Sequence, residues 1–232
     1  MIRAIVLDFN GTLAQDDDIL APLYVEAFAS LGLPLTIEEY HRDLSALPDR
    51  VVFELALRRA GLPVDERHLE ALVLDRIERY LAAVTRAQPI DAGATEFVKA
   101  ASERVMLAIA SGAFRREIDH VLIAAGLTEH FPVVVAIDDV TNGKPHPEGF
   151  TRAIDELNRV LRPDPPLTPI ETVAIEDATD GMRAARAAGM HVAAIRGLGY
   201  DPASGYADVI IDRLAPASLP DILNAGSGTR AA

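Results

Sequence analysis

Residues 2–13 read IRAIVLDFNGTL, an almost continuous apolar run that ends in a polar segment containing glycine. Such a run is typical of a strand buried on both faces of a parallel sheet. Further runs of this kind lie at 105–110, 133–137, 172–175, 191–195 and 208–211, and amphipathic segments separate most of them. This alternation predicts right-handed crossovers and an α/β fold, namely a doubly wound, Rossmann-like parallel sheet.

One stretch, residues 14–89, breaks the alternation because it contains helical patterns and no convincing strand. Thr36 and Glu39 have the spacing of a capping box before one helix. Further helices are expected at 19–31, 49–60 and 64–84. We therefore expect a core formed by residues 1–13 and 90–232, and an all-helical cap formed by residues 14–89.

The composition excludes several classes of protein. Cysteine is absent, so disulfides and thiolate metal sites are impossible. The formal net charge is −13 and no basic patch is visible, which argues against nucleic acid as a partner. No apolar run reaches the roughly 18 residues of a membrane helix, and the first residues lack a signal-peptide pattern. Together these features favour a cytoplasmic protein.

Polar residues follow four of the predicted strands, at the edge of a doubly wound sheet where ligands bind. These clusters are Asp8 to Thr12, Ser111-Gly112, Asp138-Asp139 followed by Gly143-Lys144, and Glu176-Asp177. A purely structural sheet has no need for carboxylates at three of these strand ends. The pattern therefore predicts that one site is assembled from all four loops.

The residue types at this edge suit phosphate chemistry. Asp8, Glu176 and Asp177 are hard oxygen donors that suit Mg²⁺. Lys144 can hold a phosphate, and the hydroxyl of Ser111 with nearby backbone N–H groups can bind phosphate oxygens. A carboxylate such as Asp8 can attack phosphorus and form an aspartyl-phosphate. The expected partner is a small phosphorylated metabolite.

These motifs resemble, in order and over residues 1 to about 215, those of the haloacid dehalogenase superfamily. The first motif is similar to residues 8–13, the second to Ser111, the third to Lys144 in GKPHPE, and the fourth to IEDATDG at 175–181. The helical insertion resembles the small cap of the subgroup that contains phosphoglycolate phosphatase and β-phosphoglucomutase. The resemblance implies a hydrolase, most simply a Mg²⁺-dependent phosphatase or phosphotransferase.

The resemblance also implies roles for individual residues. Asp8 would be the nucleophile and a metal ligand, and the backbone carbonyl of Asn10 would face the same metal. Asp177 would bind Mg²⁺, with Glu176 binding directly or through water. Thr12, Ser111 and Gly112 would contact the phosphoryl group beside Lys144. Arg50 falls near the family's substrate-specificity loop and is a candidate substrate contact.

Asn10 departs from the family pattern, because the phosphatases carry a second aspartate at that position. That aspartate protonates the leaving group and later activates water, which an amide cannot do, and such catalysis contributes roughly 10²- to 10⁴-fold. Four explanations are open: an engineered, trapped variant, a leaving group that needs little protonation, a substitute group from the cap, or weak or absent activity. Deamidation of the Asn10-Gly11 pair to aspartate is a further hypothesis.

Other readings compete with these assignments. Ser111 could be a helix N-cap, Asp180 a helix start and Asp139 a loop residue, while Asp16–Asp18 reads as a solvated linker. A haloacid dehalogenase would not need Glu176-Asp177, and a phosphonate-cleaving enzyme would need a cap lysine that residues 14–88 lack. A catalytically silent domain that binds phosphate or a protein partner is the alternative from a different class.

Overall fold

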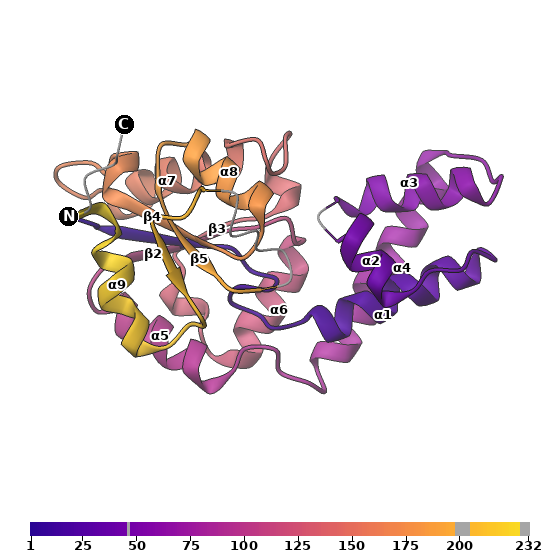
Figure 1. The fold of residues 1–232 in the computed structure, drawn as a ribbon, viewed down its shortest axis with the longest axis horizontal. Coiled ribbons are helices and arrows are strands. Elements are labelled where there is room, and N and C mark those ends of the chain that lie inside the picture. Colours follow the sequence, from indigo (N-terminus) through magenta and orange to yellow (C-terminus); the bar gives the residue numbers. More distant parts are fainter. Residues whose placement is uncertain (46, 198–204, 228–232) are drawn as a thin grey trace. The chain divides into compact units, whose positions relative to one another are not determined.

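The computed structural model describes residues 1–45, 47–197 and 205–227. Its contacts divide the chain into two compact units (Figure 1). The first unit comprises Met1–Gln15 and Ile90–Ala232, and the second comprises Asp16–Pro89. Ala14 and Gln15 group with the first unit, where the Ala14 N–H donates to the Phe9 carbonyl at 2.8 Å and the Gln15 side-chain amide donates to the Gly11 carbonyl at 3.1 Å.

The first unit is built on a parallel sheet, as predicted. Within the described residues, six strands pair in the order β3-β2-β1-β4-β5-β6, and every pairing is parallel. The strands are β1 (Ala4–Leu7), β2 (Met106–Ala110), β3 (Val133–Val135), β4 (Thr172–Glu176), β5 (His191–Ile195) and β6 (Val209–Ile211). The third strand is shorter than the run 133–137 because Ile137–Asp139 forms a 3₁₀ turn, in which Asp139 accepts the backbone N–H of Ala136 at 2.9 Å.

Helices cover both faces of the sheet, which makes it doubly wound. In Figure 1, α7 and α8 lie on one face and α5 and α6 on the other. The helices of this unit are α5 (Ala92–Ser102), α6 (Arg115–Ala125), α7 (Glu148–Leu161), α8 (Thr179–Ala187) and the short α9 (Leu219–Leu223). Gly126 ends α6 in the left-handed conformation, with φ +67°.

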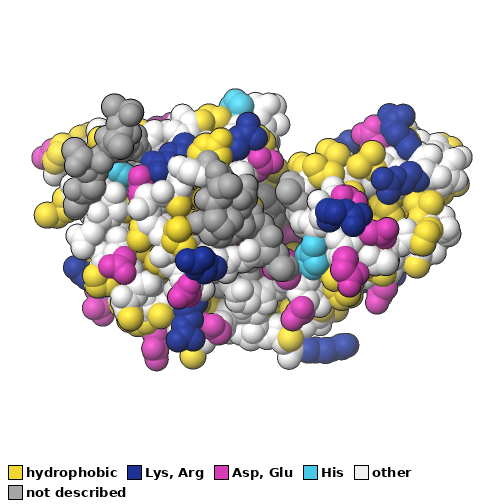
Figure 2. Space-filling model, viewed as in Figure 1, with side chains coloured by type: hydrophobic (Ala, Val, Ile, Leu, Met, Phe, Trp, Pro, Cys, Tyr) yellow, Lys and Arg dark blue, Asp and Glu magenta, His cyan; other side chains and the backbone are white. Residues whose placement is uncertain are grey.

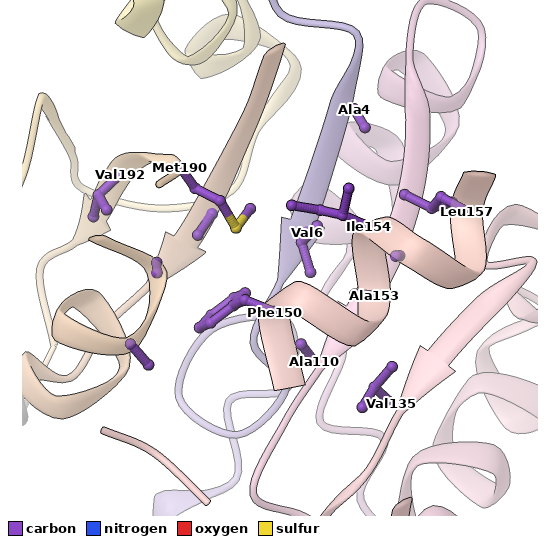
Figure 3. Packing of buried hydrophobic residues seen from close by; sticks show 14 of the residues in the cluster. Ala4, Val6, Ala110, Val135, Phe150, Ala153, Ile154, Leu157, Met190 and Val192 are labelled. Carbon is purple, nitrogen blue, oxygen red and sulfur yellow. The ribbon is translucent and has the colours of Figure 1, made fainter. Parts of the chain in front are cut away.

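The core of this unit follows from the period of each element. Ala4 and Val6 of β1 point to the same face because side chains alternate along a strand. On that face α7 packs through Phe150, Ala153 and Leu157, which recur at helical spacing (Figure 3). The central strands β1, β4 and β5 are buried at every position, which explains why they are mostly apolar, whereas the edge strand β6 is partly exposed.

The second unit consists of four helices over the residues that the structure describes: α1 (Asp17–Ser30), α2 (Ile37–Asp43), α3 (Asp49–Arg59) and α4 (Glu66–Val84). The predicted capping box is present, since Glu39 N–H donates to Thr36 Oγ1 at 3.1 Å and Thr36 N–H donates to Glu39 Oε2 at 2.9 Å. This unit is all-helical, as the sequence predicted.

The second unit also buries polar side chains, which the sequence did not predict. Arg76 forms an ion pair with Asp49, and the Tyr24 hydroxyl donates to Asp49 Oδ1 at 2.5 Å. The Tyr80 hydroxyl donates to Asp16 Oδ2 at 2.5 Å, and both side chains are fully buried. The expectation that Asp16 belongs to a solvated linker is therefore wrong, because Tyr80 supplies a buried partner.

Two observations bear on membrane-spanning and nucleic-acid-binding proteins, the classes that the composition argues against. Among the helices of the described residues, none is long and apolar enough to cross a membrane. Figure 2 shows acidic and basic side chains intermingled on the visible face rather than gathered into one basic field.

Candidate active site

Asp8 lies at the carboxyl end of β1, where the backbone holds it firmly. Its N–H continues the sheet by donating to Ile175 O at 2.9 Å. The following residue, Phe9, is fully buried and its carbonyl accepts the N–H groups of Leu13 and Ala14. Gly11 completes this tight loop with φ +70°, which other residues rarely adopt. The loop therefore fixes the Asp8 carboxylate at the edge of the sheet.

Lys144 joins two of the predicted loops by direct contact. Its Nζ lies 2.7 Å from Asp8 Oδ1 and 2.5 Å from Glu176 Oε1, and it also lies 5.4 Å from the centre of the Phe150 ring. Burial alone would lower the pKa of Lys144, but the charges of Asp8 and Glu176 outweigh it and raise that pKa above its usual value. The ammonium group is therefore held in its charged form.

Three carboxylates converge beside this lysine. Oxygens of Asp8, Glu176 and Asp177 all lie within 4.8 Å of one another. Burial, with the nearby charge of Asp8, raises the pKa of Glu176 to about 8 in spite of Lys144. Glu176 Oε2 is buried and has no hydrogen-bond partner among the described residues. Such a carboxylate needs positive charge to balance it.

These donors fit a divalent cation. With all three carboxylates ionised and Lys144 charged, the group carries a formal charge of −2, which one Mg²⁺ neutralises. Carboxylate oxygens are also the ligands that Mg²⁺ prefers. The unpartnered Glu176 oxygen and the close approach of the three carboxylates support the predicted metal site.

The expected phosphate-binding residues surround the same edge. Thr12 Oγ1 donates to Asp177 Oδ1 at 3.3 Å. Ser111 follows β2, and its hydroxyl accepts the N–H of Ala113 at 3.2 Å, while Gly112 is exposed. Ser111, Gly112 and Lys144 line one small pocket together with Phe150. Residues from separate loops are therefore brought together as expected.

Asn10 is half-buried inside the loop that carries Asp8. It pairs with Ala14 through an isolated bridge, and the N–H of the next residue, Gly11, donates to Ala14 O at 2.8 Å. Deamidation of an Asn-Gly pair requires that this glycine nitrogen attack the asparagine side chain. The hydrogen bond engages that nitrogen, so the folded loop opposes the deamidation hypothesis.

Several polar residues near this edge stabilise loops and helix starts instead. Asp138 Oδ1 accepts the backbone N–H of Arg115 at 3.0 Å at the start of α6. Asp139 pairs with the Arg115 side chain at 2.5 Å, and Asp180 accepts a hydrogen bond from Arg183 at 3.0 Å. The N-cap of α6 is Phe114, so the alternative that Ser111 is a helix N-cap is wrong.

Arg50 lies in the helical unit, at the start of α3. Its guanidinium forms two hydrogen bonds of 2.7 Å with the Glu66 carboxylate, and both side chains are more than half exposed. Because Arg50 forms a surface ion pair with Glu66, its role as a substrate contact stays a prediction.

Three glycines, for which the sequence predicted no such role, make room for the carboxylates. A Cβ on Gly11 would lie 2.3 Å from Asp177 Oδ2, and one on Gly181 would lie 2.1 Å from Glu176 Cδ. A Cβ on Gly197 would lie 3.3 Å from Asp177 Cβ. The available signal was Gly181 itself, since glycine is unfavourable within a helix and needs a reason to be there.

The fold and the site together define an α/β protein with a doubly wound sheet, whose carboxyl edge gathers an aspartate, a lysine and an acidic pair. Comparison of the sequence with family models identifies the family. The chain belongs to the haloacid dehalogenase-like hydrolase family, whose model matches residues 2–189.

Individual relatives agree with this assignment. The phosphorylated carbohydrates phosphatase of Thermotoga maritima is 30% identical over 193 residues, which are 82% of each chain. The crystal structure of CbbY from Rhodobacter sphaeroides in complex with phosphate is 26% identical, with a TM-score of 0.79 over 93% of this chain and 96% of that one. An aspartate-to-asparagine mutant of the same CbbY, crystallised with xylulose-(1,5)bisphosphate, has a TM-score of 0.80, 26% identity and the same coverage.

Proposed function

We propose that this hydrolase is a Mg²⁺-dependent phosphatase or phosphotransferase that transfers the phosphoryl group of a small organic phosphate to Asp8. The observation that carries the proposal is the contact of Lys144 with both Asp8 and Glu176, at 2.7 and 2.5 Å. A lysine that touches a strand-end carboxylate can hold a phosphate dianion against it. Phosphoryl transfer depends mostly on such positioning and charge stabilisation.

In this proposal the residues of the sheet unit have separate roles. An oxygen of Asp8 attacks phosphorus, and the bond between phosphorus and the leaving-group oxygen breaks. Lys144 holds the phosphoryl oxygens, and Thr12, Ser111 and the backbone N–H of Gly112 contact them. Asp8, Glu176, Asp177 and the carbonyl of Asn10 would hold Mg²⁺, which neutralises negative charge on the phosphoryl group when bound.

The substrate class is proposed from the relatives and the helical unit. The Thermotoga relative is named for phosphorylated carbohydrates, and a CbbY structure holds xylulose-(1,5)bisphosphate. We therefore take phosphorylated carbohydrates as the first compounds to test. The helical unit, Asp16–Pro89, would act as the cap that selects among them, with Arg50 as a candidate contact.

The proposal is tested by phosphate release from a panel of carbohydrate phosphates in the presence of Mg²⁺. The unaltered protein is compared with Asn10→Asp and Asp8→Asn. We expect Asn10→Asp to be faster than the unaltered protein by roughly 10²- to 10⁴-fold, because the carboxyl group restores acid–base catalysis. Asp8→Asn should be inactive in either background.

Two outcomes would overturn the proposal. If neither the unaltered protein nor Asn10→Asp releases phosphate, the chain is a silent phosphate- or partner-binding domain. If Asp8→Asn in the Asn10→Asp background retains the activity, Asp8 is not the nucleophile.

A further inference from the structure

The loop that carries Asn10 keeps its backbone hydrogen bonds. Asparagine at this position therefore alters the proton chemistry of the site and not the fold of the loop. Leu13 N–H and Ala14 N–H donate to Phe9 O at 2.9 and 2.8 Å, and Gly11 N–H donates to Ala14 O at 2.8 Å. Asp8 and Lys144 remain in contact on the same edge. The nucleophile and the phosphate-holding charge are therefore present, whereas the amide of Asn10 can neither give nor accept a proton at the working pH.

The neighbouring polar side chains are committed to other contacts. Lys144 pairs with Asp8 and Glu176, and Thr12 donates its hydroxyl proton to Asp177. Asp8, Glu176 and Asp177 form the carboxylate cluster that fits a cation. His146 lines the same pocket as Lys144, but its side chain is exposed and its Nδ1 accepts the backbone N–H of Glu148 at 3.3 Å. The described side chains in contact with Asp8 thus supply attack and charge balance, and the proton for a leaving group must come from elsewhere or be unnecessary.

Whether a proton is necessary depends on the leaving group. A sugar hydroxyl leaves as an alkoxide, and its conjugate acid, like water, has a pKa far above neutral pH. A carboxylic acid has a pKa of about 4, and the second pKa of a phosphate is about 6. Acyl phosphates and phosphoanhydrides therefore release anions that are stable at neutral pH without protonation, whereas sugar phosphate esters do not.

We propose that the unaltered protein uses an activated phosphate, an acyl phosphate or a phosphoanhydride, as its phosphoryl donor, and that the phosphorylated Asp8 accumulates. This inference rests on phosphoryl transfer to Asp8 from the proposed function, and for the unaltered protein it replaces sugar phosphate esters with activated phosphates as the donor. In the first step an Asp8 oxygen bonds to phosphorus while the donor's P–O bond breaks, and the leaving carboxylate or phosphate departs with the electron pair. No proton moves in this step.

The second step explains why the intermediate lasts. Water that attacks the phosphorylated Asp8 must lose a proton, and Asn10 cannot accept it. General base catalysis of this kind contributes roughly 10²- to 10⁴-fold, so hydrolysis should be slow by that factor relative to Asn10→Asp. Phosphorylation of Asp8 by an activated donor is then faster than hydrolysis of the phosphorylated Asp8.

The test compares leaving groups rather than a single substrate. The unaltered protein and Asn10→Asp are mixed with Mg²⁺ and, separately, acetyl phosphate, pyrophosphate, p-nitrophenyl phosphate and glucose 6-phosphate. Rapid quenching with intact mass spectrometry measures the phosphorylated chain, and Asp8→Asn provides the blank. The acetyl phosphate and pyrophosphate arms distinguish the two activated donor classes.

We expect the rate of phosphorylation by glucose 6-phosphate to be roughly 10²- to 10⁴-fold higher in Asn10→Asp than in the unaltered protein. For acetyl phosphate the two proteins should phosphorylate at rates within a few-fold of each other, and only the unaltered protein should accumulate phosphorylated chain. Asn224→Asp, which adds the same charge at an exposed position after α9, is the matched control and should behave like the unaltered protein.

Two results would overturn the inference while leaving the proposed function in place. One is an equal ratio of the two proteins' rates across all four donors, and the other is hydrolytic turnover of acetyl phosphate by the unaltered protein with no phosphorylated chain. Peptide mapping of each preparation verifies that residue 10 is still asparagine. If no donor phosphorylates either protein, the proposed function itself fails.

Discussion

Gly181 offers a sharp test of the carboxylate cluster, because a single methyl group there would displace Glu176. A Cβ at Gly181 would lie 2.1 Å from Glu176 Cδ and Oε1 and 2.2 Å from Oε2. Carbon atoms normally approach to about 3.5 Å, so the Glu176 carboxylate would have to move by roughly 1.4 Å. That movement breaks the 2.5 Å contact with Lys144.

The expected cost of Gly181→Ala is larger for function than for stability. Overpacking of this kind costs about 1 to 3 kcal/mol, and the gain of alanine over glycine in a helix offsets about 1 kcal/mol of it. A misplacement of about 1 Å at a catalytic centre can lower the rate roughly 100-fold. We therefore expect a folded protein with a rate of Asp8 phosphorylation about 100-fold lower and with weakened binding of Mg²⁺.

The assay pairs calorimetric titration with Mg²⁺ and the phosphorylation rate, so that binding is measured independently of turnover. Gly149→Ala in α7 is the matched control, since a Cβ there meets nothing within 4 Å and gains the same helix propensity. If Gly181→Ala bound Mg²⁺ and phosphorylated Asp8 as Gly149→Ala does, the inference that Glu176 must stay beside Lys144 would be refuted.

Three further substitutions test contacts elsewhere. Tyr80→Phe should lower the free energy of unfolding by about 1 to 3 kcal/mol, measured by urea denaturation, because it leaves the buried Asp16 carboxylate without the hydroxyl donor. Phe150→Ala should cost about 3 to 5 kcal/mol in the same assay by opening a cavity between α7 and the sheet. Burial would raise the pKa of Asp208, but the hydrogen bond from Arg186 and its neighbours lower it overall. Its folded pKa lies below the unfolded value of about 3.9, so it stabilises the fold above that pH and loses this contribution as the pH falls through the folded pKa. Asp208→Asn should flatten the loss of unfolding free energy in that acid range, and an unchanged profile would contradict the assignment.

The sheet could be predicted from the sequence because burial on both faces leaves a simple trace. A strand such as β1 is apolar at nearly every position, and polar residues begin where its carboxyl end reaches the site. The third strand was predicted too long because Ile137 is apolar as well. At Ile137 the backbone enters a 3₁₀ turn, in which the Asp139 carboxylate accepts the backbone N–H of Ala136. The hydropathy of the sequence carries no information about that hydrogen bond.

Residues at the site could be named, but their pairing could not. Asp8, Lys144 and Glu176 were expected at one edge because parallel strands all end there. Nothing in the sequence determined that Lys144 would contact both carboxylates, since that depends on the path of the loop after β3. Asp16 was misjudged for a similar reason: its partner, Tyr80, lies 64 residues away in the sequence.

The strand order gives Asp8 its position at the centre of this chemistry. In the order β3-β2-β1-β4-β5-β6, the chain moves outward from β1 to β2 and β3 and then returns to place β4 on the other side of β1. The point where the order reverses is where doubly wound sheets bind ligands, because the flanking loops diverge there. Ser111 therefore arrives from one side and Glu176 from the other, while Asp8 stands between them. A shift of β1 by one residue would point the Asp8 side chain to the opposite face and separate it from Lys144, so the buried run before Asp8 sets the reactive carboxylate in place.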